Sequence, residues 1–414
     1  MPDRPTANRV LIYSHDTFGL GHLRRCRAIA HALVERRRNV SVLILSGSPI
    51  VGSFDFNARV DFVRIPGVTK RRDGEYSALN LDMGVDEVLG LRAALIRHTA
   101  EAFRPDLFIV DKEPLGLRGE VADTLAILKG RGVPLVLGLR DVLDEPALLA
   151  PEWQRKNVLP ALKTLYDELW VYGPPGLCDP LEGVAVPPSV RRKMRYTGYL
   201  RREAPAATEA NANGADAPGH PYILVTPGGG GDGEALVDWV LRAYESDPGI
   251  PWRAVVVLGP FMHPDRRAAF LARAGALPQV TATVFEPRLE SLMRASAGVV
   301  AMGGYNTFCE ILSFDRPALI VPREVPRREQ FIRAARATEL GLASMLVDDG
   351  ERRAADMAAA LRRLPHQAPP SSVPLPGLLD GLDAVDRLAG RHLARPAAPV
   401  PRLHPHPAAE LAYG

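Results

Sequence analysis

The chain has 414 residues, which is more than one hydrophobic core usually organises, so its length predicts two domains. Hydrophobic residues make up 46% of the chain and charged residues 24%, a balance typical of globular proteins that excludes a wholly disordered chain. The formal net charge of +3 is too small to indicate a protein that binds nucleic acid.

The cysteines and the N-terminus indicate a cellular compartment. Cys26, Cys178 and Cys309 lie far apart and form no C-x-x-C pair, so we expect neither a disulfide framework nor a zinc site. The N-terminus lacks the apolar core of a signal peptide, and no apolar run approaches the roughly 18 residues of a membrane span. We therefore expect a cytoplasmic protein, whose membrane contact, if it has one, is peripheral and at the inner face of the membrane.

Three basic clusters could attract anionic lipid headgroups or an acidic substrate, or be ordinary solvated surface. They are residues 36–38, 70–72 and 191–193.

In the first half, short runs rich in Val, Ile and Leu alternate with longer helical patterns. Such runs predict the strands of a parallel sheet covered on both faces. We expect these strands at residues 9–14, 40–46, 60–65, 106–110, 134–139, 168–172 and, more weakly, 194–199. Residues 1–200 are therefore predicted to form one α/β domain.

The same pattern restarts after residues 201–220, which are rich in Ala, Asn, Gly and Pro and are expected to be a linker or an exposed insertion. In a second α/β domain, residues 221–364, helical periodicity is expected at 234–246 and 264–274. Its strands are expected at 222–226, 254–258, 281–285, 298–301, 317–321 and 344–347. Residues 365–414 are rich in Pro and Ala, and we expect one helix near 378–392 followed by a disordered tail.

Ligands of open α/β sheets bind beyond the carboxyl ends of the strands, so the loops that follow strands deserve the closest reading. The first such loop contains Gly19-Leu-Gly21, but Arg24 stands where a dinucleotide fingerprint has its third glycine, and no acidic residue ends the second strand. A nicotinamide or flavin site is therefore disfavoured. His22, at the start of a helix, is a candidate general base, with His15 a weaker one. The alternative is a histidine that only caps or packs against the helix.

The second loop, Gly228 to Gly233, has five glycines in six positions after a predicted strand. Each glycine carries an entropic cost in the folded state, so we expect the backbone of this loop to approach phosphate, helped by the dipole of the following helix. No Gly-Lys-Ser/Thr follows, which excludes a P-loop ATPase.

The third loop lies in residues 302–310 and suits a nucleoside diphosphate. Glycines let the backbone come close to a ligand, the helix start favours negative charge, and a carboxylate accepts from the hydroxyls of a ribose. The candidate residues are Gly303, Gly304, Asn306, Thr307 and Glu310. Thr307-x-x-Glu310 is also the pattern of a capping box, an alternative that does not exclude nucleotide binding.

Polar residues follow several other predicted strands. In residues 321–330, Arg327 or Arg328 could offset diphosphate charge, and Glu329 and Gln330 could bind sugar hydroxyls, although an exposed Pro/Arg loop is the alternative. We also assign Phe285 and Gly21 to the donor site.

In the first half, Asp111 is predicted to orient His22. The candidate acceptor-binding residues are Lys112, Glu113, Arg140 and Asp141. The alternative for Arg140 and Asp141 is a local ion pair.

The second half of the sequence resembles the nucleotide-sugar-binding domain of family 28 glycosyltransferases. That family includes the N-acetylglucosaminyltransferase of the peptidoglycan precursor. The shared elements, in order, are Gly228, Gly229, Gly230 and Gly231, then Gly304-x-x-Thr307-x-x-Glu310, Pro317-x-x-x-x-Pro322 and Glu329-Gln330. The resemblance implies the GT-B fold, two Rossmann-like domains facing each other across a cleft. It also implies that Glu310 holds the ribose, that the turn around Gly304 and Thr307 lies at the diphosphate, and that Gln330 contacts the donor sugar.

The first half is similar to two groups of that fold. Gly19-Leu-Gly-His22 resembles the glycine-glycine-histidine loop of these transferases. Residues 21–30, however, look closer to nucleotide-sugar hydrolases of sialic-acid-like sugar pathways, in which a histidine at this position activates water.

We therefore expect an inverting, metal-independent glycosyltransferase of the hexosyltransferase type. A nucleoside diphosphate sugar, expected to be a UDP-sugar, would be its co-substrate, and we expect no cofactor. The sequence has no Asp-x-Asp pair beside a glycine loop that could hold a metal ion, so we expect no metal site. The acceptor would be the hydroxyl of a lipid-linked or small molecule, deprotonated by His22. The alternatives are a UDP-sugar hydrolase of the same fold, a non-catalytic nucleotide-sugar-binding module and, least favoured, a dehydrogenase.

Overall fold

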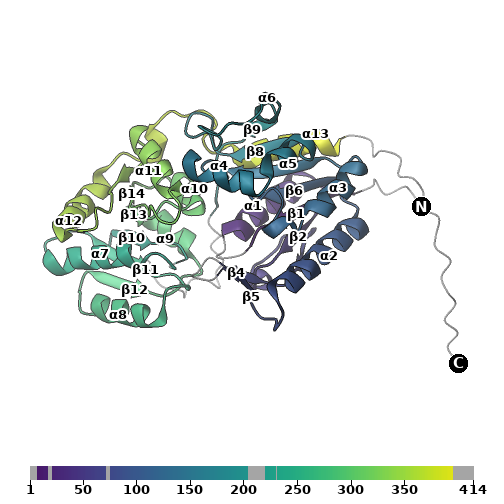
Figure 1. The fold of residues 1–414 in the computed structure, drawn as a ribbon. Coiled ribbons are helices and arrows are strands. Elements are labelled where there is room, and N and C mark those ends of the chain that lie inside the picture. The colour runs from purple at the N-terminus through teal and green to yellow at the C-terminus, as the bar shows by residue number, and fades with distance from the viewer. Residues whose placement is uncertain (1–6, 17–20, 71–74, 204–219, 230, 395–414) are drawn as a thin grey trace.

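The computed structural model describes residues 7–16, 21–70, 75–203, 220–229 and 231–394. Two parallel sheets, each between layers of helices, make up the two halves of the molecule (Figure 1). The first sheet has the order β3-β2-β1-β6-β7-β8-β9. Its strands are β1 (Asn8–Ser14), β2 (Val40–Ser46), β3 (Val60–Arg64), β6 (Leu107–Asp111), β7 (Leu135–Arg140), β8 (Glu168–Tyr172) and β9 (Met194–Tyr196).

Continuous apolar strands form because both faces of this sheet are covered. In β1, Val10 and Ile12 belong to the apolar cluster on one face, and Leu11 and Tyr13 belong to the cluster on the other. All four side chains are fully buried. The predicted parallel sheet with two covered faces is confirmed.

The second sheet repeats this arrangement in the order β12-β11-β10-β13-β14-β15. Its strands are β10 (Tyr222–Thr226), β11 (Arg253–Val257), β12 (Val280–Thr283), β13 (Gly298–Ala301), β14 (Ala318–Ile320) and β15 (Ser344–Met345). The first strand of each sheet, β1 or β10, lies in its interior, and the chain then builds outward on both sides. The loops after β1 and β10 therefore stand at the topological switch points, where ligands bind in sheets of this kind.

Helices cover both sheets. Those of the first half are α1 (Gly21–Arg36), α2 (Val85–Phe103), α3 (Ala122–Gly130), α4 (Pro146–Arg155), α5 (Val158–Thr164) and α6 (Pro188–Arg191). Those that follow are α7 (Glu234–Ser246), α8 (Pro264–Gly275), α9 (Leu289–Ala295), α10 (Tyr305–Ser313), α11 (Glu329–Glu339), α12 (Ala354–Arg363) and α13 (Gly381–Leu393).

The two halves share a buried apolar cluster. Leu23 and Cys26 of α1 lie in one cluster with Tyr305 and Phe308 of α10 and Val385 of α13. Burial of this apolar surface holds the starts of α1 and α10 close together. The two helices that begin with predicted site motifs thus pack against each other across the boundary between the halves.

The C-terminal helix α13 lies where the sequence predicts a helix and returns to the first half, beside α1 (Figure 1). Its Asp386 accepts from Nε of Arg37 at 2.5 Å, and Leu200 forms an isolated bridge with Asp380. The predicted boundaries at residues 200, 220 and 364 stay predictions. Most of the expected linker and nearly all of the expected tail lie outside the described residues.

A pair of short strands differs from the expectation. β4 (Val68–Lys70) and β5 (Tyr76–Ala78) form a separate antiparallel pair that the sequence analysis did not predict. Strands of three residues are too short to show a period of two, so their pattern carries no usable signal.

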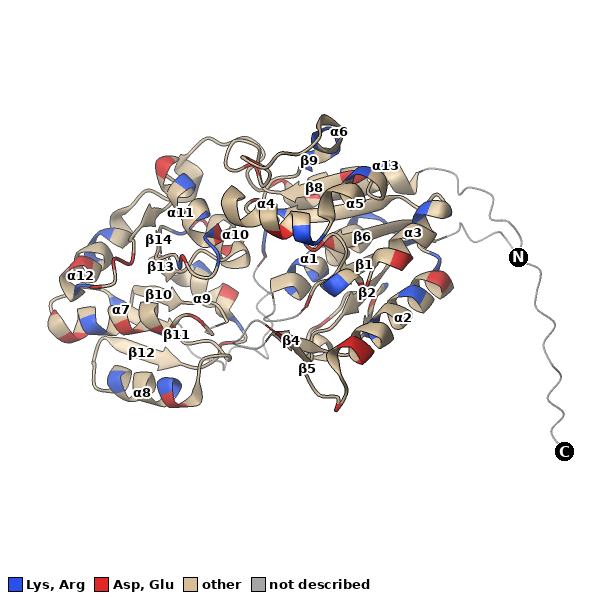
Figure 2. Cartoon of the chain, viewed as in Figure 1, with Lys and Arg blue, Asp and Glu red and all other residues tan. Residues whose placement is uncertain are grey.

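Residues of the basic clusters at 36–38 and 191–193 make contacts within the protein, whereas residues 71 and 72 of the third cluster lie outside the described residues. Arg36 pairs with Asp383 of α13 at 2.7 Å, and Arg191 pairs with Asp179 at 2.9 Å. Nζ of Lys193 donates to the carbonyl oxygens of Leu162 and Lys163 in the last turn of α5 and of Tyr166 just after it. Charges of both signs alternate along outer helices such as α2 and α8 (Figure 2). None of the described helices is both long and apolar enough to cross a membrane.

Candidate active site between the two halves

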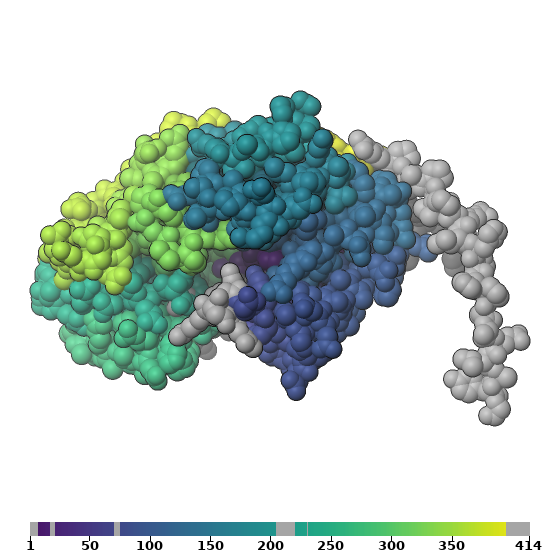
Figure 3. Space-filling model, viewed as in Figure 1, coloured from purple at the N-terminus to yellow at the C-terminus, as the bar shows by residue number. Residues whose placement is uncertain are grey.

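The surface is hollowed between the two halves, and purple residues from the beginning of the chain are visible inside the hollow (Figure 3). The carboxyl ends of β1, β6 and β7, which are neighbours in the first sheet, supply the residues on one side. The loops after β13 and β14 supply residues on the other. The candidate residues from distant parts of the sequence therefore meet here.

His22 lies in the first turn of α1, and Asp111 is the last residue of β6. Nδ1 of His22 is 2.5 Å from Oδ2 of Asp111. Arg25, one helical turn on, holds the same carboxylate with two bonds, from Nε at 2.7 Å and from Nη2 at 2.6 Å. Asp111 and Arg25 are both buried, while 16% of the His22 side chain remains exposed.

These contacts determine which nitrogen of His22 can act as a base. Burial opposes ionisation of Asp111, but Arg25 and His22 outweigh it and lower the pKa of this carboxyl. An ionised carboxylate can only accept, so Nδ1 of His22 carries the proton and Nε2 is left unprotonated. Burial lowers the pKa of His22, against the raising effect of Asp111. The imidazole is therefore neutral near pH 7, as a general base must be.

His15, the weaker candidate, is embedded behind His22. The two rings are edge to face with centroids 5.7 Å apart, and only 6% of His15 is exposed. Burial lowers the pKa of His15 to about 3. Nearby, the carboxylate of Asp16 accepts from the backbone N–H of Leu23 at 3.2 Å and from Ser46 at 2.6 Å, which fixes the first turn of α1.

Lys112 and Glu113 follow Asp111 beside His22. Their charged groups are 3.4 Å apart, and Glu113 also accepts from Lys156 at 3.0 Å. Burial lowers the pKa of Lys112. Both predicted acceptor residues thus lie next to the candidate base, on the side of the first half.

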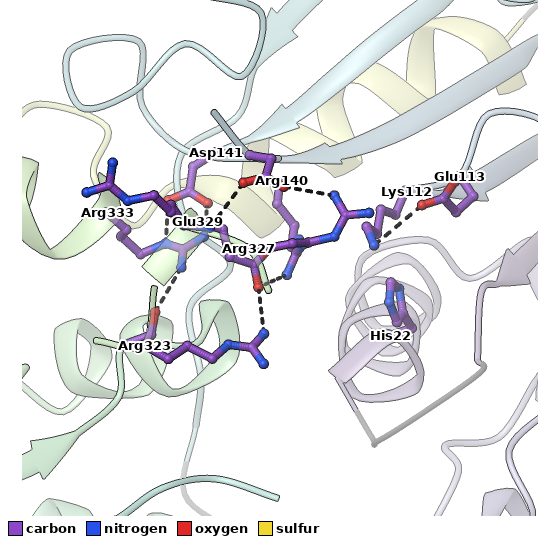
Figure 4. A network of polar contacts seen from close by, with 12 residues as sticks. His22, Lys112, Glu113, Arg140, Asp141, Arg323, Arg327, Glu329 and Arg333 are labelled. Carbon is purple, nitrogen blue, oxygen red and sulfur yellow. Dashed lines mark hydrogen bonds and ion pairs between the residues drawn. The ribbon is translucent and has the colours of Figure 1, made fainter. Parts of the chain in front are cut away.

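Arg140, predicted to bind the acceptor, and Glu329, predicted to bind the donor, contact each other across the two halves. Both nitrogens of the Arg140 fork donate to the carboxylate of Glu329 (Figure 4). Arg140, chiefly, outweighs the effect of burial and lowers the pKa of Glu329 to about 2. Arg323 reaches the same carboxylate at 3.8 Å and also pairs with Asp232 of the glycine loop.

Asp141 has a different environment from Arg140. It is fully buried, and Arg333 of α11 binds both its oxygens, at 2.6 and 2.7 Å. Tyr199 donates to it at 2.6 Å, and Arg333 also donates to the carbonyl oxygen of Gly303 at 2.8 Å. The local Arg140–Asp141 ion pair does not form, because each residue pairs with the second half. Asp141 here joins the halves and presents no oxygen to the hollow.

Glu310, the predicted ribose carboxylate, is 1% exposed and lies one helical turn beyond Asn306. Nη2 of Arg24 is 2.5 Å from Oε1 of Glu310 and 2.5 Å from Oε1 of Glu290. Nδ2 of Asn306 donates to the carbonyl oxygen of Gly21 at 3.0 Å. The predicted donor motif is thus tied directly to the helix that carries His22.

The start of α10 corrects the capping-box alternative. The helix begins at Tyr305 with Gly304 as its N-cap, and no side chain caps it. Thr307 is therefore the third helical residue, so it cannot form the box with Glu310. Gly303 has a positive φ of 77°, and a Cβ there would lie 2.7 Å from Ile320, so this position requires glycine. The N–H groups of the first turn are left without a side-chain cap.

The glycine loop after β10 has packing reasons for part of its composition. Gly228 has a positive φ of 82°, and a Cβ on Gly233 would lie 2.1 Å from Pro227. A close approach to phosphate is therefore not needed to explain these two glycines. Gly229 and Gly231 are in the described part of the loop, and Gly230 lies outside it.

The remaining predicted donor residues have varied surroundings. Phe285 follows β12 and is 56% exposed, whereas Gln330 is 7% exposed and accepts from the backbone N–H of Arg323 at 3.1 Å. Arg327 binds Glu152 at 2.9 Å, and Arg328 binds Glu145. Both arginines thus turn to carboxylates of the first half instead of the diphosphate position that the sequence suggested.

Four arginines were not singled out by the sequence analysis: Arg24, Arg25, Arg323 and Arg333. Each binds a carboxylate of a candidate site residue or, for Arg323, of Asp232 in the glycine loop. Arg24 and Arg25 fall in the segment that resembles the hydrolases, which was the one available signal. A guanidinium partner on another element cannot be found from spacing along the chain.

Comparisons with known proteins found similar sequences. Residues 228–370 match the glycosyltransferase family 28 C-terminal domain. A protein described as an uncharacterized glycosyltransferase of Methanosarcina acetivorans is 24% identical over 353 residues, covering 79% of this chain and 83% of that protein.

Solved structures share the fold. MurG of Acinetobacter baumannii superposes with a TM-score of 0.58 at 12% identity, covering 93% of this chain and 99% of MurG. A UGT transferase of Siraitia grosvenorii in complex with UDP gives 0.58 at 13% identity, with 93% and 99% covered. The chain therefore has the GT-B fold, and residues 228–370 in its second half match the glycosyltransferase family 28 C-terminal domain.

Proposed function

We propose that this protein transfers a sugar, with inversion, from a UDP-sugar to the hydroxyl of an acceptor, with His22 as the general base. The observation that carries the proposal is the contact between His22 and Asp111, which directs an unprotonated Nε2 away from the carboxylate. In an inverting transfer the acceptor oxygen loses its proton as it attacks the anomeric carbon. A neutral imidazole with its other nitrogen held by an ionised carboxylate suits that step.

The donor is assigned to the second half. Glu310 would take the ribose hydroxyls, the first turn of α10 with Gly304, Asn306 and Thr307 would take the diphosphate, and Glu329 with Gln330 would take the sugar. The family 28 match over residues 228–370 supports this assignment, as does the UDP bound in the Siraitia grosvenorii structure of the same fold.

The leaving diphosphate needs positive charge. The N–H groups at the start of α10, which no side chain of the described residues caps, provide a partial positive charge. Arg323 adds a guanidinium that already connects the glycine loop to Glu329. We propose that these groups take the part that a metal ion has in other transferases, and that turnover is the same in EDTA.

We propose that Lys112, Glu113 and Arg140 contact the acceptor. Lys112 and Glu113 lie near His22, and Arg140 lies further toward the second half (Figure 4). Asp141 is proposed instead to fix α11 against the first half through Arg333.

The test is to incubate the protein with UDP-sugars, alone and with mixtures of hydroxyl acceptors, and to follow UDP and products by mass spectrometry. The proposal predicts release of UDP that depends on acceptor, and a glycoside of inverted configuration by NMR. Rapid stoichiometric release of UDP and free sugar, insensitive to acceptor, would establish the hydrolase instead. Binding of UDP without turnover on any donor would favour the non-catalytic module.

A further inference from the structure

Glu310 is closed to a ligand in this structure. It is 1% exposed, and the guanidinium of Arg24 is in direct contact with it at 2.5 Å. Burial raises the pKa of this carboxyl, and Arg24 opposes that rise. A ribose cannot reach the carboxylate while the Arg24 side chain stays where it is.

The guanidinium offers Glu310 the same chemistry that a ribose would offer. Both groups present hydrogen-bond donors to a carboxylate, which accepts only. An unpaired buried carboxylate is costly, so a site that must be empty between turnovers benefits from a temporary partner.

Arg24 also has a second carboxylate available. Its Nη2 is 2.5 Å from Glu290, which is 23% exposed and lies in α9. If Arg24 leaves Glu310, it keeps its ion pair with Glu290 and turns toward solvent, so its charge does not become buried and unpaired. The two carboxylates therefore allow a small movement of the side chain.

Taken with the donor site proposed above, on which the inference rests, we propose that Arg24 occupies the ribose position on Glu310 and shifts onto Glu290 when a nucleoside diphosphate binds. Arg24 is then a specificity-determining residue for the donor. A ligand with ribose hydroxyls can replace its hydrogen bonds to Glu310, and a ligand without them cannot. Arg24 lies two residues from His22, so its movement on donor binding takes place in the first turn of α1, beside the candidate base.

The test is calorimetric titration with UDP and with 2′,3′-dideoxy-UDP. Arg24→Gln removes the competitor, so it is expected to tighten UDP binding by about tenfold, the factor by which a partly blocked site lowers apparent affinity. Arg24→Gln should change the affinity for dideoxy-UDP by no more than about twofold, because that ligand has no ribose hydroxyls to bind Glu310. Glu290→Gln is expected to weaken UDP binding, since it leaves Arg24 with Glu310 as its partner.

The control is Arg328→Gln, which removes another ion pair between the halves, with Glu145, and does not touch Glu310. Equal tightening by Arg24→Gln and Arg328→Gln would show a general loosening of the halves and overturn the inference. It would also be overturned if Arg24→Gln weakened UDP binding, or tightened both ligands equally. A wild-type protein that binds no UDP would instead overturn the donor assignment itself. Melting temperatures of all variants check that each is folded.

Discussion

His22 and Asp111 are 89 residues apart in the chain, yet Nδ1 of the one lies 2.5 Å from Oδ2 of the other. The contact forms because β1 and β6 are neighbouring parallel strands, so the loop after β1 and the last residue of β6 meet at the same edge of the sheet. Arg25 binds both oxygens of the carboxylate, including the Oδ2 that His22 contacts, and keeps it ionised. The arrangement fixes both the ring orientation and the tautomer of His22.

Asp111→Asn should reduce turnover by roughly 10²- to 10⁴-fold, because the amide no longer selects the tautomer with an unprotonated Nε2. UDP affinity measured by calorimetry should stay the same, since Asp111 does not belong to the donor site. Asp106→Asn is the matched control, because Asp106 precedes the other end of β6 and accepts from the backbone N–H of Arg9. A variant Asp111→Asn with normal turnover would contradict the role of Asp111.

The rate should depend on pH through His22. Burial lowers the pKa of this imidazole below its ordinary value of 6.5, and Asp111 opposes that shift. A protonated ring cannot accept a proton, so kcat/KM is expected to be constant from pH 8 down to about 6.5 and to fall only at lower pH. In Asp111→Asn the remaining rate should fall at still lower pH, because the charge that raises the pKa of His22 is gone. A wild-type midpoint above 6.5 would contradict this account.

Stability should depend on pH through His15, whose pKa is lowered by burial to about 3. The unfolded chain binds a proton near pH 6.5 and the folded chain does not, so stability is complete above pH 6.5 and falls as the pH drops toward 3. At pH 5 this residue alone should cost about 2 kcal/mol of unfolding free energy, at about 1.4 kcal/mol per pH unit. Urea unfolding at pH 7.5 and pH 5 measures it. His15→Gln should reduce the difference between the two pH values, and His98→Gln, at an exposed position, should not.

Removing one partner of the buried pair of Asp141 and Arg333 should lower the unfolding free energy more than replacing both partners with apolar residues. Asp141→Asn leaves a buried guanidinium uncompensated, so it should lower the unfolding free energy by about 3–5 kcal/mol. The double variant Asp141→Leu with Arg333→Met should be less destabilised than the sum of the single changes, because no charge remains buried. Denaturant unfolding of Asp141→Asn, of the single variants Asp141→Leu and Arg333→Met, and of their double variant decides the point, and additive losses would contradict it.

Much of the fold could be predicted from the sequence. The strands with continuous apolar runs, such as Val40–Ser46 and Tyr222–Thr226, were predicted with the bounds that the structure gives. The hairpin of β4 and β5 could not be predicted, because three-residue strands have no readable period. The start of α10 was misjudged because Thr307-x-x-Glu310 fits a capping box, whereas Gly304 begins the helix.

The candidate site was predicted in part. Position after a parallel strand was enough to select Asp111, Arg140 and Glu310, because the fold brings strand ends together. Their partners could not be predicted, since pairing with Arg24, Arg333 or Glu329 depends on how the two halves pack. Sequence spacing describes neighbours within an element and carries no information about contacts between distant ones.

We propose above that His22 deprotonates an acceptor during transfer from a UDP-sugar. The most direct measurement is the rate of UDP release with donor and acceptor by wild type and by His22→Ala, with UDP affinity measured in parallel. Loss of the general base should lower turnover by about 10²- to 10⁴-fold and leave UDP affinity unchanged. Turnover that survives in His22→Ala, at a rate close to that of wild type, would contradict the claim.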